Sequence, residues 1–524
     1  MTQRDCYRST GEGMGGVVRN PGYLLAVAAL LATVSSAEMQ GPIRTESGLV
    51  SGVAGRDASI TTFQGIPYAA PPVGNLRWAP PIPPPNWQGV RRADHFSDGC
   101  VQNFPKGDFP KSEDCLYLNV WTPANSATAA LPVMVYIHGG GLRVGASREP
   151  LYDGEELAEN GIVVVTLNYR LGILGFFAHP ELTKESPRHT SGNYGLLDQL
   201  AALQWVHRNI EAFGGNPNKV TIFGQSAGAF SVTAQVVSPL SKGLFRAAIV
   251  ESGGVGSGFA RTEVLSLEDA EKAGVKFADS VSARSLAELR AMPAEKMLSD
   301  GSAESNVDGL FFPASPVTLL KEGKQNKVAM IVGSNSDEGQ HLFRAPVPAS
   351  DYAEQARKNY GADADRFLTL YPNDSEEASK ASQQRMFADR MALGEQNLAA
   401  SMTSVRSNVY LYYFDYLDDG GYNSEPAALG LRLGADHGAE LPYVFGLMNH
   451  WKAPIPDQDI QLQNTVMQYW ANFAKNLDPN GKGLPVWDVF RGVDSPIMIL
   501  DKRSSMRPHP RASQLEFLRS HGVK

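Results

Sequence analysis

The most constraining part of this sequence is a serine between two glycines, Gly224-Gln225-Ser226-Ala227-Gly228. The apolar, β-branched residues 220–223 predict a buried strand before it, and the small residues after it predict a closely packed helix. A strand that reverses sharply into a helix strains its central residue and leaves no room for a Cβ on either side. The pattern therefore predicts that Ser226 is presented as a nucleophile at the start of a helix. A glycine-rich turn with an incidental serine is the alternative.

Short apolar runs recur along the chain and alternate with segments of helical periodicity. Strands are expected at 116–121, 133–137, 162–167, 220–223, 247–250, 329–332 and 409–414, and helices at 193–213 and 462–473. This alternation predicts an α/β fold with a large, mostly parallel central sheet and helices on both faces.

The length of 524 residues suggests about three domains of ordinary size. However, no internal repeat or low-complexity linker interrupts the chain after residue 48, which predicts a single domain over 38–524. Two stretches, near 255–325 and 345–405, are polar, helical in pattern and poor in buried strands. They are expected to be insertions over the active site that form a lid or a substrate wall.

The N-terminus has the pattern of a targeting segment. Arg19 precedes an apolar run at 23–34, and the small residues Ser35-Ser36-Ala37 follow it. This predicts a cleavable signal peptide over 1–37 and a secreted or periplasmic protein, with Met14 as an alternative start. An uncleaved anchor is the other interpretation, but the run is short for a membrane span. No later stretch is apolar enough to predict membrane insertion of the mature chain.

Charge and cysteine content narrow the functional classes. The net charge is −8 and no basic cluster is interleaved with aromatic residues, so nucleic acid is not an expected partner. Of three cysteines, Cys6 lies in the predicted signal peptide. Cys100 and Cys115 then most simply form one disulfide in an oxidising compartment, and two buried thiols are the alternative.

A nucleophilic serine needs hydrogen-bond donors for the oxyanion. His138-Gly139-Gly140-Gly141 follows the predicted strand 133–137, and three consecutive glycines leave backbone N–H groups unobstructed. Gly140 and Gly141 are therefore predicted to form an oxyanion hole, with the N–H of Ala227 as a third donor. A flexible turn is the alternative.

The serine also needs a base and an acid. Of ten histidines, His437 is favoured because its late position fits the chain order serine, acid, histidine. The adjacent residues Asp337 and Glu338 come just after the predicted strand 329–332, where α/β sheets build their sites. From the residues alone, either carboxylate could be the acid.

The chain resembles the type B carboxylesterase/lipase family, the cholinesterase-like α/β-hydrolases. The motifs that carry the resemblance are Phe63-Gln64-Gly65-Ile66-Pro67-Tyr68, Ser112-Glu113-Asp114-Cys115-Leu116-Tyr117-Leu118-Asn119-Val120-Trp121-Thr122-Pro123, His138-Gly139-Gly140-Gly141, Asn168-Tyr169-Arg170, Gly195-Leu196-Leu197-Asp198-Gln199 and Phe213-Gly214-Gly215-Asn216-Pro217. These motifs occur in order between residues 63 and 217, and the resemblance covers almost the whole mature chain.

This resemblance implies the α/β-hydrolase fold and hydrolysis of small-molecule carboxylic esters without a metal or cofactor. It implies Ser226 as nucleophile, Glu338 as the acid and His437 as general base. It also implies the oxyanion hole of Gly140, Gly141 and Ala227, and the disulfide between Cys100 and Cys115. Two ion pairs of the family would correspond to Arg77 with Glu113 and Arg170 with Asp198.

The sequence departs from the family pattern at three places. Gln225 stands where glutamate is usual, which removes a negative charge near the reacting centre. The segment 101–114 contains no tryptophan, which argues against choline esters. Leu142 and Arg143 stand where an aromatic residue is usual, and Arg143 could attract a substrate carboxylate, point to solvent or pair with an acid. Gln225, Leu142 and Arg143 are therefore the predicted substrate-binding residues.

The sequence thus predicts a serine esterase that works through an acyl-enzyme and favours esters carrying anionic groups. The alternatives are a lipase acting on longer acyl chains and a cholinesterase-like recognition module without catalysis. The sequence predicts no oligomeric state.

Overall fold

The computed structural model describes residues 39, 41–103, 109–254, 264–298, 304–417, 428–450 and 455–522. All of these residues fall in one compact unit, 37–524. The predicted signal peptide, 1–37, lies outside the described residues.

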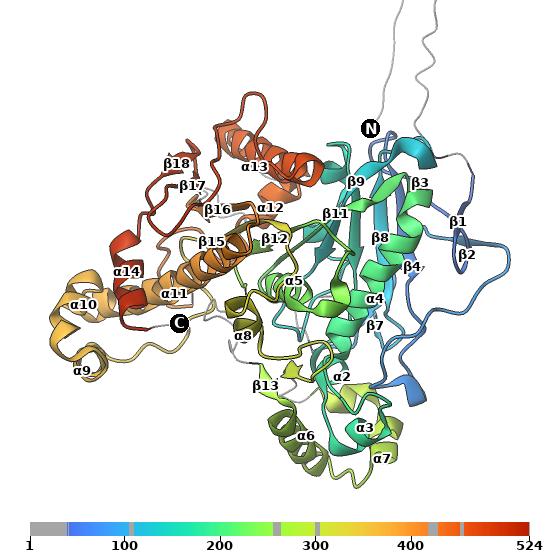
Figure 1. Cartoon of the computed structure of the whole chain (residues 1–524), viewed down its shortest axis with the longest axis horizontal. Helices are drawn as coiled ribbons and strands as arrows, with labels where there is room; N and C mark the ends of the chain where they lie inside the picture. Colours follow the sequence, from blue (N-terminus) through green and yellow to red (C-terminus); the bar gives the residue numbers. More distant parts are fainter. Residues whose placement is uncertain are drawn as a thin grey trace, which may run out of the picture. The chain divides into compact units, whose positions relative to one another are not determined.

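A central sheet organises this unit (Figure 1). Its eleven strands lie in the order β18-β17-β16-β15-β12-β11-β9-β10-β8-β4-β3. The bounds are β3 Val53–Ala54, β4 Thr61–Pro67, β8 Tyr117–Thr122, β9 Leu131–Ile137, β10 Val163–Leu167, β11 Gly215–Gln225, β12 Ala247–Glu251, β15 Ala329–Asn335, β16 Val409–Phe414, β17 Ile497–Leu500 and β18 Ser505–Arg507. Neighbouring strands from β10 to β17 are parallel, and those outside this block are antiparallel. The predicted mostly parallel sheet is confirmed.

Strand β11 occupies the middle of the sheet, between β9 and β12. Near its end, Gly224 pairs with Ile137 of β9 on one side and with Val250 of β12 on the other. Ser226 therefore follows β11 at the carboxyl edge of the parallel strands, where α/β sheets place their sites.

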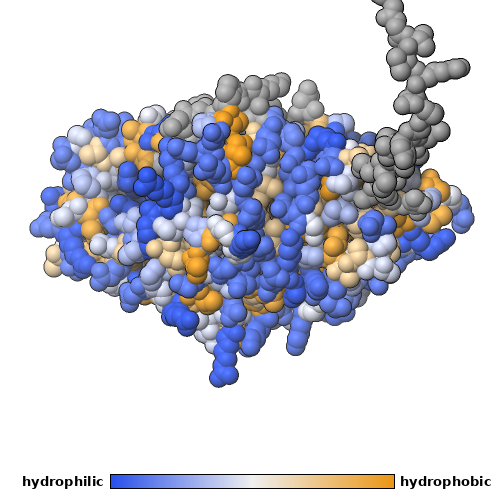
Figure 2. Space-filling view, turned by 90° about the horizontal axis from the view of Figure 1, so that it is seen from above, coloured by the Kyte–Doolittle hydropathy of each residue, from blue (hydrophilic) through white to orange (hydrophobic). Residues whose placement is uncertain are grey.

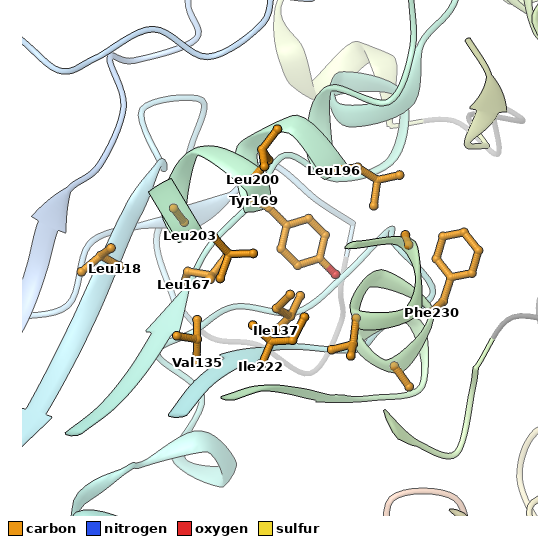
Figure 3. Packing of buried hydrophobic residues seen from close by; sticks show 14 of the residues in the cluster. Leu118, Val135, Ile137, Leu167, Tyr169, Leu196, Leu200, Leu203, Ile222 and Phe230 are labelled. Carbon is orange, nitrogen blue, oxygen red and sulfur yellow. The ribbon is translucent and has the colours of Figure 1, made fainter. Parts of the chain in front are cut away.

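Helices cover both faces because the strand residues alternate between two cores. Along β9, Val133, Val135 and Ile137 join one core, while Met134 and Tyr136 join the other. The first core includes residues of α4 (Tyr194–Asn209), α5 (Ala227–Val237) and the end of α11 (Glu376–Ser404). Figure 3 shows the apolar side chains packed between the strands and α4 and α5. The second core includes residues of α1 (Glu155–Ala158), α12 (Leu441–Val444) and α13 (Asp457–Asn476).

The two polar stretches near 255–325 and 345–405 are largely helical where they are described. The first contains β13 Leu265–Ser266, α6 Leu267–Ser280, α7 Leu286–Ala291, β14 Asn306–Val307 and α8 Pro316–Lys321. The second contains α9 Ala349–Tyr360, α10 Ala364–Leu370 and α11. The end of α11 packs on the sheet through Leu398, Ala399 and Met402, which join the first core with Val332 and Val409. The second stretch therefore contributes a helix, α11, to the layer that packs on one face of the sheet.

Both ion pairs implied by the family resemblance are confirmed. The Arg170 guanidinium donates to Asp198 at 2.7 and 2.8 Å, and both side chains are buried. Arg77 donates to Glu113 at 2.5 and 2.7 Å and also to the carbonyl of Met292, at 2.6 Å. Removing one partner of a buried ion pair leaves an uncompensated charge. These pairs therefore stabilise the contacts between segments that are distant in the sequence.

Within the described ranges, no helix is both long enough and apolar enough to cross a bilayer. On the face shown in Figure 2, hydrophobic residues are scattered among hydrophilic ones. Surface apolar residues that are scattered in this way are usual for a globular domain.

Candidate active site

Ser226 lies at a sharp reversal between β11 and α5. Its backbone has φ 59° and ψ −126°, a conformation that non-glycine residues rarely adopt. It is the residue before the first turn of α5, yet its side chain does not cap that helix. The backbone holds it instead, because its N–H donates to the carbonyl of Glu251 at 2.9 Å and its carbonyl accepts from Phe230 at 3.0 Å. The hydroxyl therefore remains available for chemistry.

The two glycines of the motif are required by close packing. A Cβ at Gly228 would lie 2.0 Å from the carbonyl oxygen of Ile137, and a Cβ at Gly224 would lie 2.6 Å from the same atom. Real Cβ atoms do not come so close, so β11 and α5 can pack on the end of β9 only with glycine at both positions. The steric interpretation of the motif is confirmed.

The glycine loop 139–141 lies directly beside this reversal. A Cβ at Gly139 would be 2.7 Å from the carbonyl oxygen of Gln225 and 3.1 Å from the Cβ of Ser226. Gly140 and Gly141 have φ of 100° and 64°, in the left-handed region that favours glycine. Among the described residues, the N–H groups of Gly140, Gly141 and Ala227 donate no hydrogen bond. The three predicted oxyanion donors are thus free of acceptors within that part of the chain.

Two contacts that sequence reasoning missed hold the glycine loop in place. The His138 ring stacks on Tyr169 at 4.5 Å, and the Tyr169 hydroxyl donates to the His138 carbonyl at 2.8 Å. Burial lowers the pKa of His138 to about 4, so this ring is neutral at physiological pH. At the other end of the loop, the Gln102 amide exchanges two hydrogen bonds with the backbone of Gly145. Tyr169 belongs to a motif of the family, whereas no sequence pattern singles out Gln102.

The structure brings His437 and Glu338 together although 99 positions separate them. The distance from His437 Nδ1 to Glu338 Oε2 is 2.5 Å, and the Glu338 side chain is fully buried. The other oxygen of Glu338 accepts the N–H of Asn335 at 2.6 Å, which fixes the carboxylate at the end of β15. Because a carboxylate only accepts, Nδ1 carries a proton, and Nε2 of the neutral ring is an acceptor.

The His437 Nε2 atom has a partner next to Ser226. The side-chain amide nitrogen of Gln225 lies 3.1 Å from Nε2. The Ser226 hydroxyl itself makes no hydrogen bond among the described residues. The ring is therefore held from both sides, by Glu338 at Nδ1 and by Gln225 at Nε2.

Asp337, the other candidate acid, has different partners. Its carboxylate accepts from the Gln384 amide of α11 at 2.8 Å and from the backbone N–H of Leu433 at 2.8 Å. Burial raises the pKa of Asp337 to about 6. Its role in the structure is to join α11 to the loop that precedes His437.

Three further buried carboxyls surround this centre. Burial raises the pKa of Glu251 to about 7, and those of Glu395 and Glu440 to about 8. They bind the Trp470 indole, the backbone N–H groups of Gly253 and Gly254, and the Asn335 amide, respectively. Below about pH 7 these groups are largely protonated, so they add little negative charge beside the His437–Glu338 pair.

The remaining predicted site residues lie at or near the glycine loop. Leu142 is half-buried with φ 59°, and its carbonyl accepts from Gly172 at 2.7 Å. Arg143 is exposed, and its guanidinium has no ion pair among the described residues.

The disulfide between Cys100 and Cys115 is formed. Within the described residues, no group of three or more potential ligands is placed to hold a metal ion.

Comparison with known proteins identifies the family. The sequence model of the carboxylesterase family matches residues 40–518. The chain belongs to the carboxylesterase family.

Individual members of the carboxylesterase family agree with this assignment. The chain is 37% identical to a fumonisin B1 esterase of Sphingopyxis macrogoltabida, over 85% of this chain and 84% of that protein. It is 38% identical to the cocaine esterase of Homo sapiens, over 88% of each chain. A solved structure of a PNB esterase, 31% identical, superposes with a TM-score of 0.74 over 91% of this chain and 99% of that one. The fold is therefore the α/β-hydrolase fold, and the chain is a carboxylic ester hydrolase.

The buried carboxyls of this carboxylesterase predict a measurable pH effect on stability. A carboxyl whose pKa is higher in the folded than in the unfolded chain stabilises the fold below the unfolded pKa. That stability is lost as the pH rises through the folded pKa, for Glu395 between about 4.5 and 8. Glu395→Gln keeps an acceptor for Gly253 and Gly254 but cannot ionise. We expect its melting temperature to fall less than that of the wild type between pH 5 and pH 8.

Differential scanning calorimetry at a series of pH values measures this difference. Glu268→Gln serves as the control, because Glu268 is an exposed side chain of α6. Parallel pH curves for the wild type and Glu395→Gln would contradict the prediction.

Proposed function

We propose that Ser226, His437 and Glu338 form the catalytic triad of this esterase and that the reaction proceeds through an acyl-enzyme. The observation that carries the proposal is the 2.5 Å contact between His437 and Glu338 beside the reversal at Ser226. A base oriented by a carboxylate, next to a serine in a strained turn, is the arrangement that activates a weak nucleophile.

In the first half of the reaction, the Ser226 oxygen attacks the ester carbonyl and its proton passes to Nε2 of His437. The carboxylate of Glu338 stabilises the resulting imidazolium through Nδ1–H. The N–H groups of Gly140, Gly141 and Ala227 bind the oxyanion of the tetrahedral intermediate, and each such donor is worth about 3 kcal/mol. The intermediate collapses, His437 protonates the leaving alcohol, and the acyl group remains on Ser226.

In the second half, water takes the place of the alcohol. His437 removes a proton from the water, which attacks the acyl carbonyl. The same donors bind the second oxyanion, and collapse releases the carboxylic acid and regenerates the Ser226 hydroxyl. Every step uses groups of this chain and one water molecule.

Substitutions at the two adjacent carboxylates test the assignment of the acid. With p-nitrophenyl butyrate as substrate, we expect Ser226→Ala to abolish turnover and Glu338→Gln to lower kcat by about 10⁴-fold, because the histidine tautomer is no longer enforced. Asp337→Asn is the matched control, and we expect it to retain kcat within about tenfold because the Asp337 carboxylate contacts Gln384 and Leu433. A larger loss in Asp337→Asn than in Glu338→Gln would reverse the assignment.

The proposed specificity is for esters that carry an anionic group. Arg143 is two residues beyond Gly141, exposed and without an ion pair among the described residues, so its charge is available to a ligand. Guanidinium binds carboxylates in a bidentate manner. Leu142 and Gln225 would border the same substrate, since both adjoin the proposed oxyanion hole and nucleophile.

The charge preference is tested by replacing Arg143. We expect Arg143→Ala to lower kcat/KM on an ester with a carboxylate by about tenfold, equivalent to a loss of 1–2 kcal/mol of charge-assisted binding. Its kcat/KM on a neutral ester of the same shape should change little. Arg188→Ala, which removes another exposed arginine, is the control. Equal losses on both esters, or none, would refute the preference.

We also propose that residues 1–37 are a signal peptide and that the mature enzyme is exported. The disulfide between Cys100 and Cys115 supports this, because such bonds persist in oxidising compartments. N-terminal sequencing of the protein recovered outside the cytoplasm should give Glu38 as the first residue. A chain that stays inside with its first residues intact would contradict export.

A further inference from the structure

The amide of Gln225 occupies a defined place between two glycines of the site. A Cβ at Gly139 would lie 3.3 Å from Gln225 Oε1, and a Cβ at Gly438 would lie 3.6 Å from Gln225 Nε2. The side chain is thus packed between the glycine loop and the residue after His437, and Gln225 is buried, with 5% exposure. Its 3.1 Å contact with His437 Nε2 therefore belongs to a packed side chain.

The contact of Glu338 with Nδ1 determines the direction of the hydrogen bond at Nε2. Glu338 accepts at Nδ1, so the neutral ring carries its proton there and offers a lone pair at Nε2. The Gln225 NH₂ group can donate to that lone pair. A glutamate at the same position could only accept, and it would favour the protonated ring.

We propose that Gln225 is a positioning residue that holds the neutral imidazole of the resting enzyme by donating to Nε2, and that the ring exchanges this partner for Ser226 when the ester binds. This inference rests on the proposed role of His437 as the general base. Gln225 and Ser226 are consecutive, so both partners of Nε2 come from the same turn of the chain. Because the Ser226 hydroxyl has no hydrogen bond among the described residues, Gln225 supplies a contact at Nε2 that adds to the contact of Glu338 at Nδ1 before substrate arrives.

Several ionisable groups also surround the ring, and their effects must be separated from that of Gln225. Glu338 contacts Nδ1, and Asp436 accepts the backbone N–H of His437 at 2.7 Å. The ring of His341, which is bonded to Asp436, lies 6.0 Å from the ring of His437. The buried carboxyls Glu395 and Glu440 interact electrostatically with Glu338, and Glu251 interacts with Glu440. Substitutions at Gln225 leave all of these ionisable residues in place, so a change in the pH profile of such a variant reflects the altered contact at Nε2.

The pH profile of kcat/KM tests the proposal, because it reports on the ionisations of the free enzyme. The profiles of the wild type, Gln225→Met and Gln225→Glu are compared with p-nitrophenyl butyrate. Gln225→Met removes the donor without adding charge, and we expect the acidic limb to move to higher pH by roughly half a unit. Gln225→Glu adds a charge that favours the imidazolium, and we expect a rise of about one unit or more. Gln461→Glu, an exposed glutamine of α13, should leave the limb in place.

The profile of Gln225→Met is the decisive test of the proposed role of Gln225. If its acidic limb coincides with that of the wild type, the amide does not hold the base and the inference fails. A shifted limb in Gln225→Glu would not rescue it, because a nearby charge changes the ionisation of the ring without any hydrogen bond. Gln225→Leu repeats the removal of the amide if Gln225→Met does not fold, as judged by thermal unfolding. His437→Ala separates the two proposals, since retained activity in that variant overturns the triad itself, whereas an inactive His437→Ala with an unmoved Met profile overturns only the role of Gln225.

Discussion

The close packing of the β11–α5 reversal against the end of β9 is the constraint on which the rest of this structure depends. At Gly224 and Gly228 the chain approaches the Ile137 carbonyl so closely that any side chain would force the elements apart. This approach places Ser226 in a strained backbone and puts Gly139 against its Cβ. Strain at one residue is tolerated because the central strands and both cores hold the reversal in place. The proposed nucleophile and the proposed oxyanion donors are therefore positioned by the same backbone contact.

Electrostatic interactions also determine the surroundings of His437 and of the glycine loop. The His437–Glu338 pair lies near buried carboxyls whose pKa values are raised by burial, so below about pH 7 they add little negative charge near the ring. In such a poorly solvated place, fixed dipoles act strongly on a developing charge. The backbone N–H groups of the glycine loop are of this kind. His138 and Tyr169 hold the loop in place by stacking and by one hydrogen bond, so the proposed oxyanion donors need no rearrangement.

Two departures from the family pattern, at Gln225 and Arg143, adjoin this centre and leave the proposed triad and glycine loop unchanged. Gln225 stands where glutamate is usual and has an amide that can donate to the His437 ring, and Arg143 places a cation beside the glycine loop. Both changes make the surroundings of the reacting carbonyl less negative. This is the direction expected for an esterase whose substrates carry negative charge, and it is the opposite of what a cationic choline ester would require.

The sequence by itself determined the alternation of strands and helices, the reversal at Ser226 and the glycine loop, because each depends on residues that are close together in the chain. The strand predicted at 409–414 is β16 without change, and the helix predicted at 193–213 continues as a 3-10 turn to Phe213 before Gly214. The residues alone left Glu338 and Asp337 as equal candidates, and the tertiary structure shows that their partners differ. Neighbouring side chains at the end of a strand point to different partners, and those partners, His437 and Gln384, come from distant segments. The contact of Gln225 with His437 was equally beyond local patterns, since a hydrogen bond between residues 212 positions apart exists only after the sheet has brought both loops to the same edge.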